Sequence, residues 1–142
     1  MNRGVESVLL LEDDAIFGET FTEDVKKFLS NVPANWGMIY LGGQHLKVRE
    51  KPPKRLNPEV FIPYNVNRTH AFAIRGKCME VIYKHLNTQD WTKRNHIDNH
   101  LGRFHQERNK KYPVYCPKNW LVGQREGQSN IAGREVPPRF WA

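Results

Sequence analysis

The stretch that decides the fold is Ser7-Val8-Leu9-Leu10-Leu11-Glu12-Asp13-Asp14, near the start of the chain. Its first five residues form a short run that is mostly apolar, and three acids follow directly. A run this short, apolar on both faces, is typical of a buried central strand rather than of an amphipathic helix. In an open α/β sheet, ligand-binding residues follow the carboxyl ends of such strands. The stretch therefore predicts an α/β fold with a polar site directly after its first strand.

The three acids can be interpreted in two ways. In an extended chain alternate side chains share a face, so Glu12 and Asp14 would point one way and Asp13 the other. Two carboxylates that converge at a strand end suit Mg²⁺ or Mn²⁺, which bind oxygen ligands and complete their coordination with water and substrate phosphates. The alternative is that the acids only cap the following turn or helix, because negative charge stabilises a helix N-terminus. The residues by themselves leave both interpretations open.

Downstream, helical and strand patterns follow the first strand in a β-α-β order, which favours one mixed α/β domain over residues 1–142. A polar, basic and proline-bearing segment, residues 44–58, is expected to be a long irregular loop. The tail from residue 121 onward is expected to run back over the surface. Helices are predicted at residues 22–31, 78–86 and 100–108, and strands at residues 36–43, 60–64, 70–74 and 112–117.

Composition excludes several classes of protein. The 142 residues carry a net charge of +7, but the basic residues are spread along the chain, so a dedicated nucleic-acid groove is the less supported interpretation. No apolar run approaches the ~18 residues of a membrane span, and the N-terminus lacks a signal-peptide pattern. We therefore expect a soluble, cytoplasmic chain.

Cys78 and Cys116 are far apart and are expected to be free thiols. No G-x-G-x-x-G, P-loop, G-x-S-x-G or C-x-x-C motif occurs.

A second polar group, Asn95-His96-Ile97-Asp98-Asn99-His100, precedes the last predicted helix. Asp98 can be the N-cap of that helix, or a general base that takes a proton from an acceptor hydroxyl. His96 and His100 have the spacing of a metal-binding pair, but no H-E-x-x-H motif joins them and a zinc site is disfavoured.

The segment Asn67-Arg68-Thr69-His70-Ala71 opens a predicted strand. A polar cluster in this place is usually a turn. Arg68 and His70 would also suit a glycosyl acceptor or a pyrophosphate, because both can donate hydrogen bonds to anionic or hydroxyl oxygens. The cluster is therefore a candidate substrate-binding segment.

Taken in order along the chain, these segments resemble glycosyltransferase family 25, which includes bacterial lipooligosaccharide galactosyltransferases and collagen galactosyltransferases. The order and spacing fit along most of the chain. The resemblance is carried by residues 8–14, residues 36–42, Thr69-His70-Ala71-Phe72-Ala73-Ile74, Ile97-Asp98-Asn99-His100-Leu101 and residues 124–131.

The resemblance implies a GT-A-like (Rossmann-like) mixed sheet flanked by helices and a nucleotide-diphosphate sugar donor such as UDP-galactose or UDP-glucose. It also implies Mn²⁺ or Mg²⁺ as a cofactor and a saccharide or glycoprotein acceptor. By position, Asp14 would bind the metal directly and Glu12 would act through water or on the donor ribose. Asp98 would be the catalytic base of an inverting transfer. The other implied contacts are Gln124, Gln128 and Ser129 near the diphosphate or acceptor. Arg68, Thr69 and His70 of the polar cluster are the candidate substrate residues.

Such enzymes carry a nucleotide-binding half before the acidic motif, whereas only seven residues precede Val8. We therefore expect a chain truncated at its N-terminus, the metal and acceptor half of a transferase, completed by a homo-oligomer or a partner chain. The alternative is a non-catalytic basic module that binds nucleic acid or a protein. A metal-dependent phosphoesterase is a third interpretation, but it would need more clustered His and Asp ligands.

Overall fold

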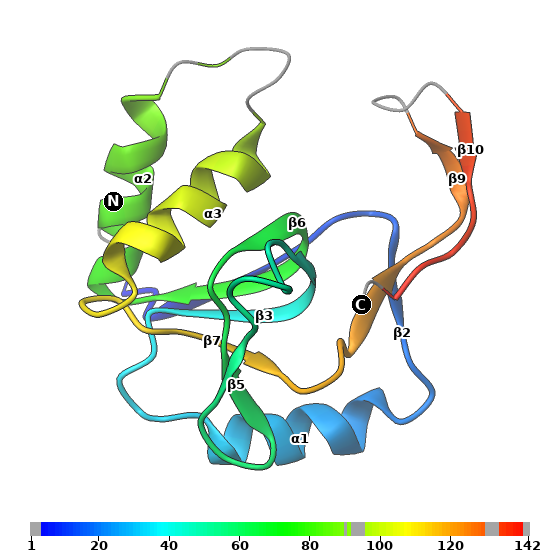
Figure 1. Cartoon of the computed structure of the whole chain (residues 1–142), viewed down its shortest axis with the longest axis horizontal. Coiled ribbons are helices and arrows are strands. Elements are labelled where there is room, and N and C mark those ends of the chain that lie inside the picture. Colours follow the sequence, from blue (N-terminus) through cyan, green and yellow to red (C-terminus); the bar gives the residue numbers. More distant parts are fainter. Residues whose placement is uncertain (1–3, 90, 92–95, 130–133, 141–142) are drawn as a thin grey trace.

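The computed structural model describes residues 4–89, 91, 96–129 and 134–140. Three helices pack around a mixed six-stranded sheet, and a hairpin near the C-terminus extends beyond it (Figure 1). The predicted mixed α/β architecture is therefore confirmed. In chain order the elements are β1 (Ser7–Leu11), β2 (Ala15–Phe17), α1 (Phe21–Asn31), β3 (Met38–His45), β4 (Lys54–Arg55), β5 (Val60–Ile62), β6 (Val66–Arg75), α2 (Lys77–Asn87), α3 (Ile97–Arg108), β7 (Val114–Pro117), β8 (Val122–Gln124), β9 (Gly127–Ser129) and β10 (Arg134–Val136).

The six strands of the main sheet follow the order β1-β6-β3-β7-β5-β4. Only β3 and β7 run parallel, and the other neighbours in this sheet pair antiparallel. Two short antiparallel pairs, β2 with β8 and β9 with β10, lie outside it. The pairing of β2 with β8 matters for the site, because it brings the C-terminal part of the chain beside the acids that follow β1.

The core lies on both faces of β3, whose first six residues are buried. Met38 and Tyr40 belong to the cluster that α2 and α3 cover, whereas Ile39 and Leu41 belong to the cluster under α1. This alternation follows from the period of two in a strand. The predicted buried strand at residues 36–43 is thus confirmed, and the helices cover the sheet from both sides.

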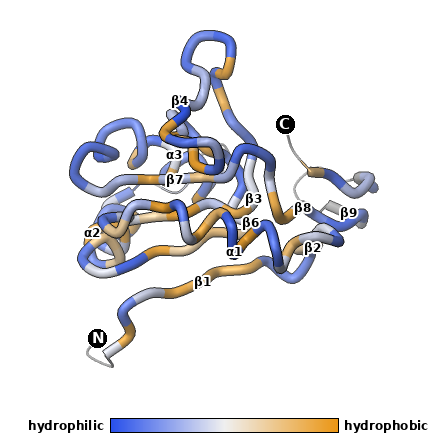
Figure 2. The backbone as a smooth tube through the Cα atoms, turned by 90° about the horizontal axis from the view of Figure 1, so that it is seen from below, coloured by the Kyte–Doolittle hydropathy of each residue, from blue (hydrophilic) through white to orange (hydrophobic). Residues whose placement is uncertain are grey.

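The prediction of a buried central strand is wrong for β1. This strand is at the edge of the sheet and pairs only with β6. Its four apolar side chains are 38–52% exposed, with Leu9 the most exposed. Figure 2 shows β1 as a hydrophobic strand with no element beyond it. The apolar run therefore predicted the strand correctly but not its burial, because burial depends on which elements pack over it.

Two further expectations need correction. The polar cluster at residues 67–71, for which a turn was the usual interpretation, lies inside β6: Asn67 pairs with Gln44 of β3, and Ala71 pairs with both Leu11 of β1 and Gly42 of β3. The tail from residue 121 onward, expected to run back over the surface, contains the strands β8, β9 and β10. The predicted helices are confirmed, although α3 begins at Ile97 rather than at His100.

Candidate functional site

Glu12 and Asp14 are brought together by a tight turn directly after β1. The Glu12 N–H donates to the His70 carbonyl oxygen at 3.0 Å and continues the pairing of β1 with β6. The Ala15 N–H then donates to the Glu12 carbonyl oxygen at 3.1 Å, which closes the turn. Asp13 lies at the tip of this turn and is exposed, while Asp14 is half-buried.

Gln124 joins the two carboxylates. Its backbone pairs with Ala15 where β8 meets β2. Its Nε2 lies 3.4 Å from Glu12 Oε2 and 3.2 Å from Asp14 Oδ2. An ionised carboxylate only accepts hydrogen bonds, so the amide nitrogen, not the amide oxygen, faces both acids. Glu12 and Asp14 therefore converge on one point, which the Gln124 amide nitrogen occupies.

Thr69 fixes the other oxygen of Glu12. Its hydroxyl donates to Glu12 Oε1 at 2.7 Å from the neighbouring strand β6. Asp14 is held through its backbone, because the Arg125 N–H donates to the Asp14 carbonyl oxygen at 2.7 Å. The side-chain oxygen Oδ1 of Asp14 is buried and, among the described residues, accepts no hydrogen bond. One buried carboxylate oxygen is thus left available next to the shared point.

These oxygens fit a divalent cation of the Mg²⁺ or Mn²⁺ type. Such ions are often held by one or two carboxylates, with water and substrate phosphates completing the coordination. Among the described residues no group of three or more His, Cys, Asp and Glu side chains gathers around a common point. Glu12 and Asp14 would therefore supply two ligands at most, and the Gln124 amide would have to turn or move to admit the ion.

His70 supports the site from within. It is fully buried, and its Nε2 lies 3.1 Å from the Val122 carbonyl oxygen, so Nε2 carries the proton. The contact crosses β3 at Gly42, where a Cβ would collide with both the His70 ring and the Val122 oxygen. Burial lowers the pKa of His70, against the opposing effects of the Val122 carbonyl, Glu12 and Asp14. The expected substrate contact does not fit this burial, so we assign His70 a positioning role.

Arg68 lies in an irregular part of β6. Its φ of 77° is in the left-handed region, and the pairing of β6 with β3 shifts register between residues 67 and 71. This conformation costs a non-glycine residue roughly 1–2 kcal/mol and persists where the surrounding structure holds it. Such a bulge re-aims neighbouring side chains. The half-buried Arg68 therefore lies in an irregular stretch of the strand, directly before Thr69, and not in a turn between elements.

Asp98 stands apart from this cluster. It is the second residue of α3, whose N-cap is His96, so the interpretation of Asp98 as the N-cap is wrong. Its Oδ1 accepts from the Asn99 N–H at 2.8 Å. Asn99 in turn accepts from Asn67 of β6 at 3.4 Å, which links the start of α3 to the site strand. Within the described part of the chain, no hydrogen bond joins Asp98 to Glu12 or Asp14.

The remaining predicted residues have less support. Gln128 and Ser129 lie on β9, but their side chains fall outside the described part of the chain. His96 is exposed, whereas His100 is buried and its Nδ1 lies 3.1 Å from Gln89 Oε1. His100 is thus already used inside the fold, which agrees with the disfavoured zinc pair.

Sequence reasoning missed a ring pair close to the end of β3. His45 and Trp120 have ring centroids 4.6 Å apart, and burial lowers the pKa of His45 to about 4. Trp120 also approaches the position that a Cβ at Gly43 would take. The glycine pair signalled a close approach, but no spacing in the sequence indicated which ring fills it.

The fold is a mixed α/β domain in which the candidate site residues Glu12 and Asp14 directly follow the first strand, the place where open α/β sheets commonly bind ligands. Residues 1–112 match the family model described as glycosyltransferase family 25 (LPS biosynthesis protein). The chain therefore belongs to glycosyltransferase family 25. No curated protein matches the chain significantly. The matched region includes Glu12, Asp14, residues 68–70 and Asp98, whereas Gln124 and β9 lie beyond it. No described helix combines the length and the apolar character needed to cross a membrane.

Proposed function

We propose that the chain transfers a hexose, galactose or glucose, from a UDP-sugar to a hydroxyl of a saccharide or protein, with a divalent cation and on a GT-A-like fold. Family membership supports a glycosyltransferase. The observation that carries the proposal further is the convergence of Glu12 and Asp14 on one point, next to the buried and unpartnered Oδ1 of Asp14. A cation with phosphate ligands needs this kind of incomplete carboxylate site.

In this proposal Asp14 and Glu12 hold the cation, which would offset the negative charge that builds on the leaving diphosphate. Thr69 keeps Glu12 in place through the 2.7 Å hydrogen bond. His70 keeps β8 against β3 through Val122, and thereby holds Gln124 beside both carboxylates. Arg68, next to Thr69 on β6, would bind an anionic group of the substrate.

Asp98 is the proposed general base. The acceptor hydroxyl oxygen forms a bond to the anomeric carbon while the bond from that carbon to the diphosphate oxygen breaks, and the hydroxyl proton passes to Asp98. The half-buried carboxylate lies in the first turn of α3, and its Oδ1 accepts a hydrogen bond from the Asn99 N–H. Substrate must lie between Asp98 and the Glu12–Asp14 pair for this transfer.

The test is calorimetric titration of the chain with UDP, first with Mn²⁺ and then with EDTA. Asp14→Asn removes a charge from the convergent pair. Asp13→Asn removes the same charge from the exposed tip of the turn and is the matched control. We expect cation-dependent binding that Asp14→Asn lowers by at least about tenfold, or about 1.4 kcal/mol, and that Asp13→Asn changes little.

Equal loss in both variants would show that only net charge matters and would contradict a cation site at Asp14. Binding of nucleic acid that falls steeply with salt and ignores the cation would instead favour the basic binding module, because phosphate contacts release counterions.

A further inference from the structure

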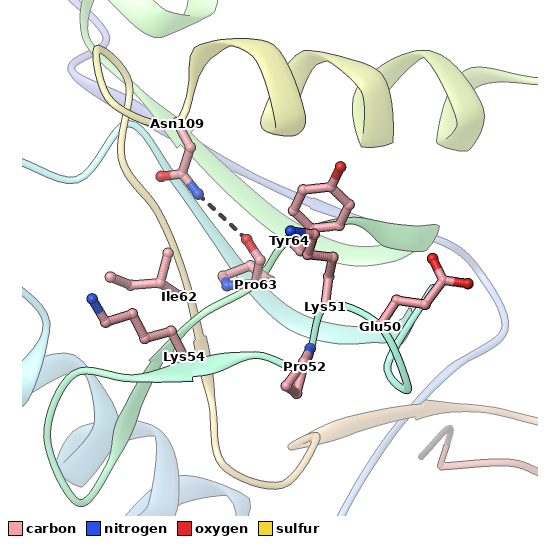
Figure 3. Close-up of a pocket in the computed structure, with 8 residues that line it drawn as sticks. All are labelled: Glu50, Lys51, Pro52, Lys54, Ile62, Pro63, Tyr64 and Asn109. Atoms are coloured by element: carbon pink, nitrogen blue, oxygen red, sulfur yellow. Dashed lines mark hydrogen bonds between the residues drawn. The ribbon is translucent and has the colours of Figure 1, made fainter.

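A surface hollow of about 290 Å³ lies away from the carboxylate pair, between the loop that follows β3 and the segment that joins β5 to β6 (Figure 3). This volume is just below the range of small-molecule sites, roughly 300–1,000 Å³, and suits a single sugar unit. None of its residues belongs to the site described above. The lining residues are Glu50, Lys51, Pro52, Lys54, Ile62, Pro63, Tyr64 and Asn109.

The walls of the hollow are held in place by backbone hydrogen bonds. Lys54 pairs with Ile62 where β4 meets β5, and the Leu46 N–H donates to the Asn65 carbonyl oxygen at 3.0 Å. Lys47 has a φ of 59°, and its carbonyl oxygen accepts from the Lys51 N–H at 2.7 Å. The loop is therefore tied to the opposite wall at two points and closed by its own turn, so the hollow exists before a ligand binds.

Asn109 closes one end of the hollow as a fixed wall. Its Nδ2 donates to the Pro63 carbonyl oxygen at 3.3 Å, and its Oδ1 accepts from the Val114 N–H at 3.0 Å. Figure 3 shows the first of these bonds reaching across to Pro63. The Asn109 amide is thus committed to the fold, and the groups that could meet a ligand are those of the lysines and of Tyr64.

The loop on one side of the hollow is basic, and the charged residues of the lining itself are Lys51, Lys54 and the acid Glu50. Residues 47–55 contain five basic residues and one acid, a net charge of +4. Among the described residues the only ion pair is Lys27–Glu59, so neither Lys51 nor Lys54 has a carboxylate partner there. Figure 3 shows Lys51 extending toward Tyr64, while the Glu50 carboxylate turns away from it. Figure 3 shows the Lys54 ammonium group at the opposite end of the lining, beyond Ile62, so the Lys51 ammonium group is the one next to the Tyr64 ring.

The chemistry of the lining identifies the class of ligand. The ring of Tyr64 and the apolar surface of Ile62 and the prolines suit the face of a sugar ring, because aromatic and apolar surfaces bury its C–H groups. The ammonium groups of Lys51 and Lys54 suit a phosphate or a carboxylate. We propose that this hollow is a subsite for an anionic sugar unit of the acceptor, which rests on the transferase function proposed above.

Its place in the fold suggests the form of the acceptor. Asn109 follows the last residue of α3, whereas Asp98 is in the first turn. At 1.5 Å per residue, the two positions are roughly 16 Å apart along the helix. A unit bound in the hollow would therefore be remote from the attacking hydroxyl, and the acceptor would be an oligosaccharide that reaches from the hollow to the base.

The test titrates the full chain with glucose 6-phosphate, glucuronic acid, glucose and inorganic phosphate, with amide NMR shifts as the readout. Glucose 6-phosphate and glucuronic acid distinguish a phosphate from a carboxylate. We expect one or both to shift the amides of Lys51, Ile62 and Tyr64 and to bind about tenfold more tightly than glucose or phosphate alone.

The double variant Lys51→Ala/Lys54→Ala should lower this affinity about tenfold, whereas Lys26→Ala/Lys84→Ala, which removes the same charge from exposed positions on α1 and α2, should change it little. Tyr64→Ala should weaken binding and Tyr64→Phe should preserve it. Equal loss in both lysine pairs, equally tight binding of phosphate alone, or shifts confined to other residues would overturn the proposal.

These titrations contain neither UDP nor cation, so they test the hollow separately from the donor site. Asp14→Asn should leave the binding of glucose 6-phosphate unchanged while it removes cation-dependent binding of UDP. In the unchanged chain, sugar-phosphate binding without cation-dependent UDP binding would contradict the proposed donor site alone, and UDP binding without sugar-phosphate binding would contradict the hollow alone.

Discussion

The side-chain amide nitrogen of Gln124 lies 3.2 Å from Oδ2 of Asp14, although 110 residues separate the two in the sequence. The pairing of β8 with β2 makes this contact, and the same nitrogen reaches Glu12. A neutral amide that donates to both acids relieves part of their repulsion, as a bound cation would do more fully. A cation at this point must therefore turn the amide, so that its oxygen faces the ion, or push it aside.

Gln124→Glu tests this arrangement. A third carboxylate would replace the hydrogen-bond donor, so we expect the cation-free chain to lose about 1–3 kcal/mol of unfolding free energy through like-charge repulsion and the lost bonds. We expect Mn²⁺ to bind at least about tenfold more tightly, because three carboxylates attract the ion more strongly than two. Urea unfolding with EDTA and calorimetric titration with Mn²⁺ measure the two effects.

Gln106→Glu introduces the same charge on α3 and should leave Mn²⁺ affinity close to that of the unchanged chain. If both variants gained the same affinity, the cation would respond to net charge only, and the proposed place between Glu12 and Asp14 would be wrong.

Gly42 on β3 has no side chain, which leaves room for the His70 ring to contact the Val122 carbonyl oxygen. Gly42→Ala would place a methyl group against the His70 ring and the Val122 carbonyl oxygen, neither of which is the end of a flexible side chain. Overpacking of this kind costs typically 1–3 kcal/mol, which urea unfolding would measure. Gly18→Ala adds the same methyl group where no atom lies within 4 Å, so it should change stability little. Equal stability of the two variants would contradict a tight approach at Gly42.

Much of the fold could be predicted because it depends on local pattern. The two-sided apolar run before Gly42 predicted the central strand, and the spacing of Val25, Phe28 and Leu29 predicted α1, of which Phe28 is buried. The alternation of side chains also predicted that Glu12 and Asp14 converge, although the backbone reaches that arrangement through a tight turn rather than an extended strand.

What could not be predicted depends on which distant elements meet. The same kind of apolar run in β1 is exposed, because β1 pairs on one side only and neither core cluster includes it. Gln124 was identified by resemblance alone, and its contact with Asp14 requires the pairing of β8 with β2. The hollow around Lys51 was missed, although the basic composition of its loop was a signal, because the opposite wall comes from another segment.

The exposed β1 predicts association of the chain. An edge strand with unpaired backbone groups and apolar side chains pairs readily with another strand. Leu9, 52% exposed, is the most exposed of these side chains, and Leu9→Lys should shift an oligomer toward monomer in sedimentation experiments at high concentration. Leu56→Lys changes a comparably exposed leucine outside the strands and should have little effect. A strictly monomeric unchanged chain would contradict the association.

Buried histidines predict loss of stability in mild acid. Burial lowers the pKa of His105 to about 3, and the Tyr40 hydroxyl lies 3.0 Å from its Nε2. The unfolded chain takes up a proton below a pH of about 6.5, whereas the folded chain resists it until the pH approaches the lowered pKa. The free energy of unfolding should therefore fall as the pH drops from about 6.5 toward 3, by up to about 1.4 kcal/mol per pH unit for this group. His105→Gln should make the dependence shallower over this range in urea unfolding. Tyr40→Phe, which removes the hydrogen bond but keeps the imidazole, should lower stability at every pH without flattening the slope. If His105→Gln kept the slope of the unchanged chain, acid sensitivity would have to come from other groups.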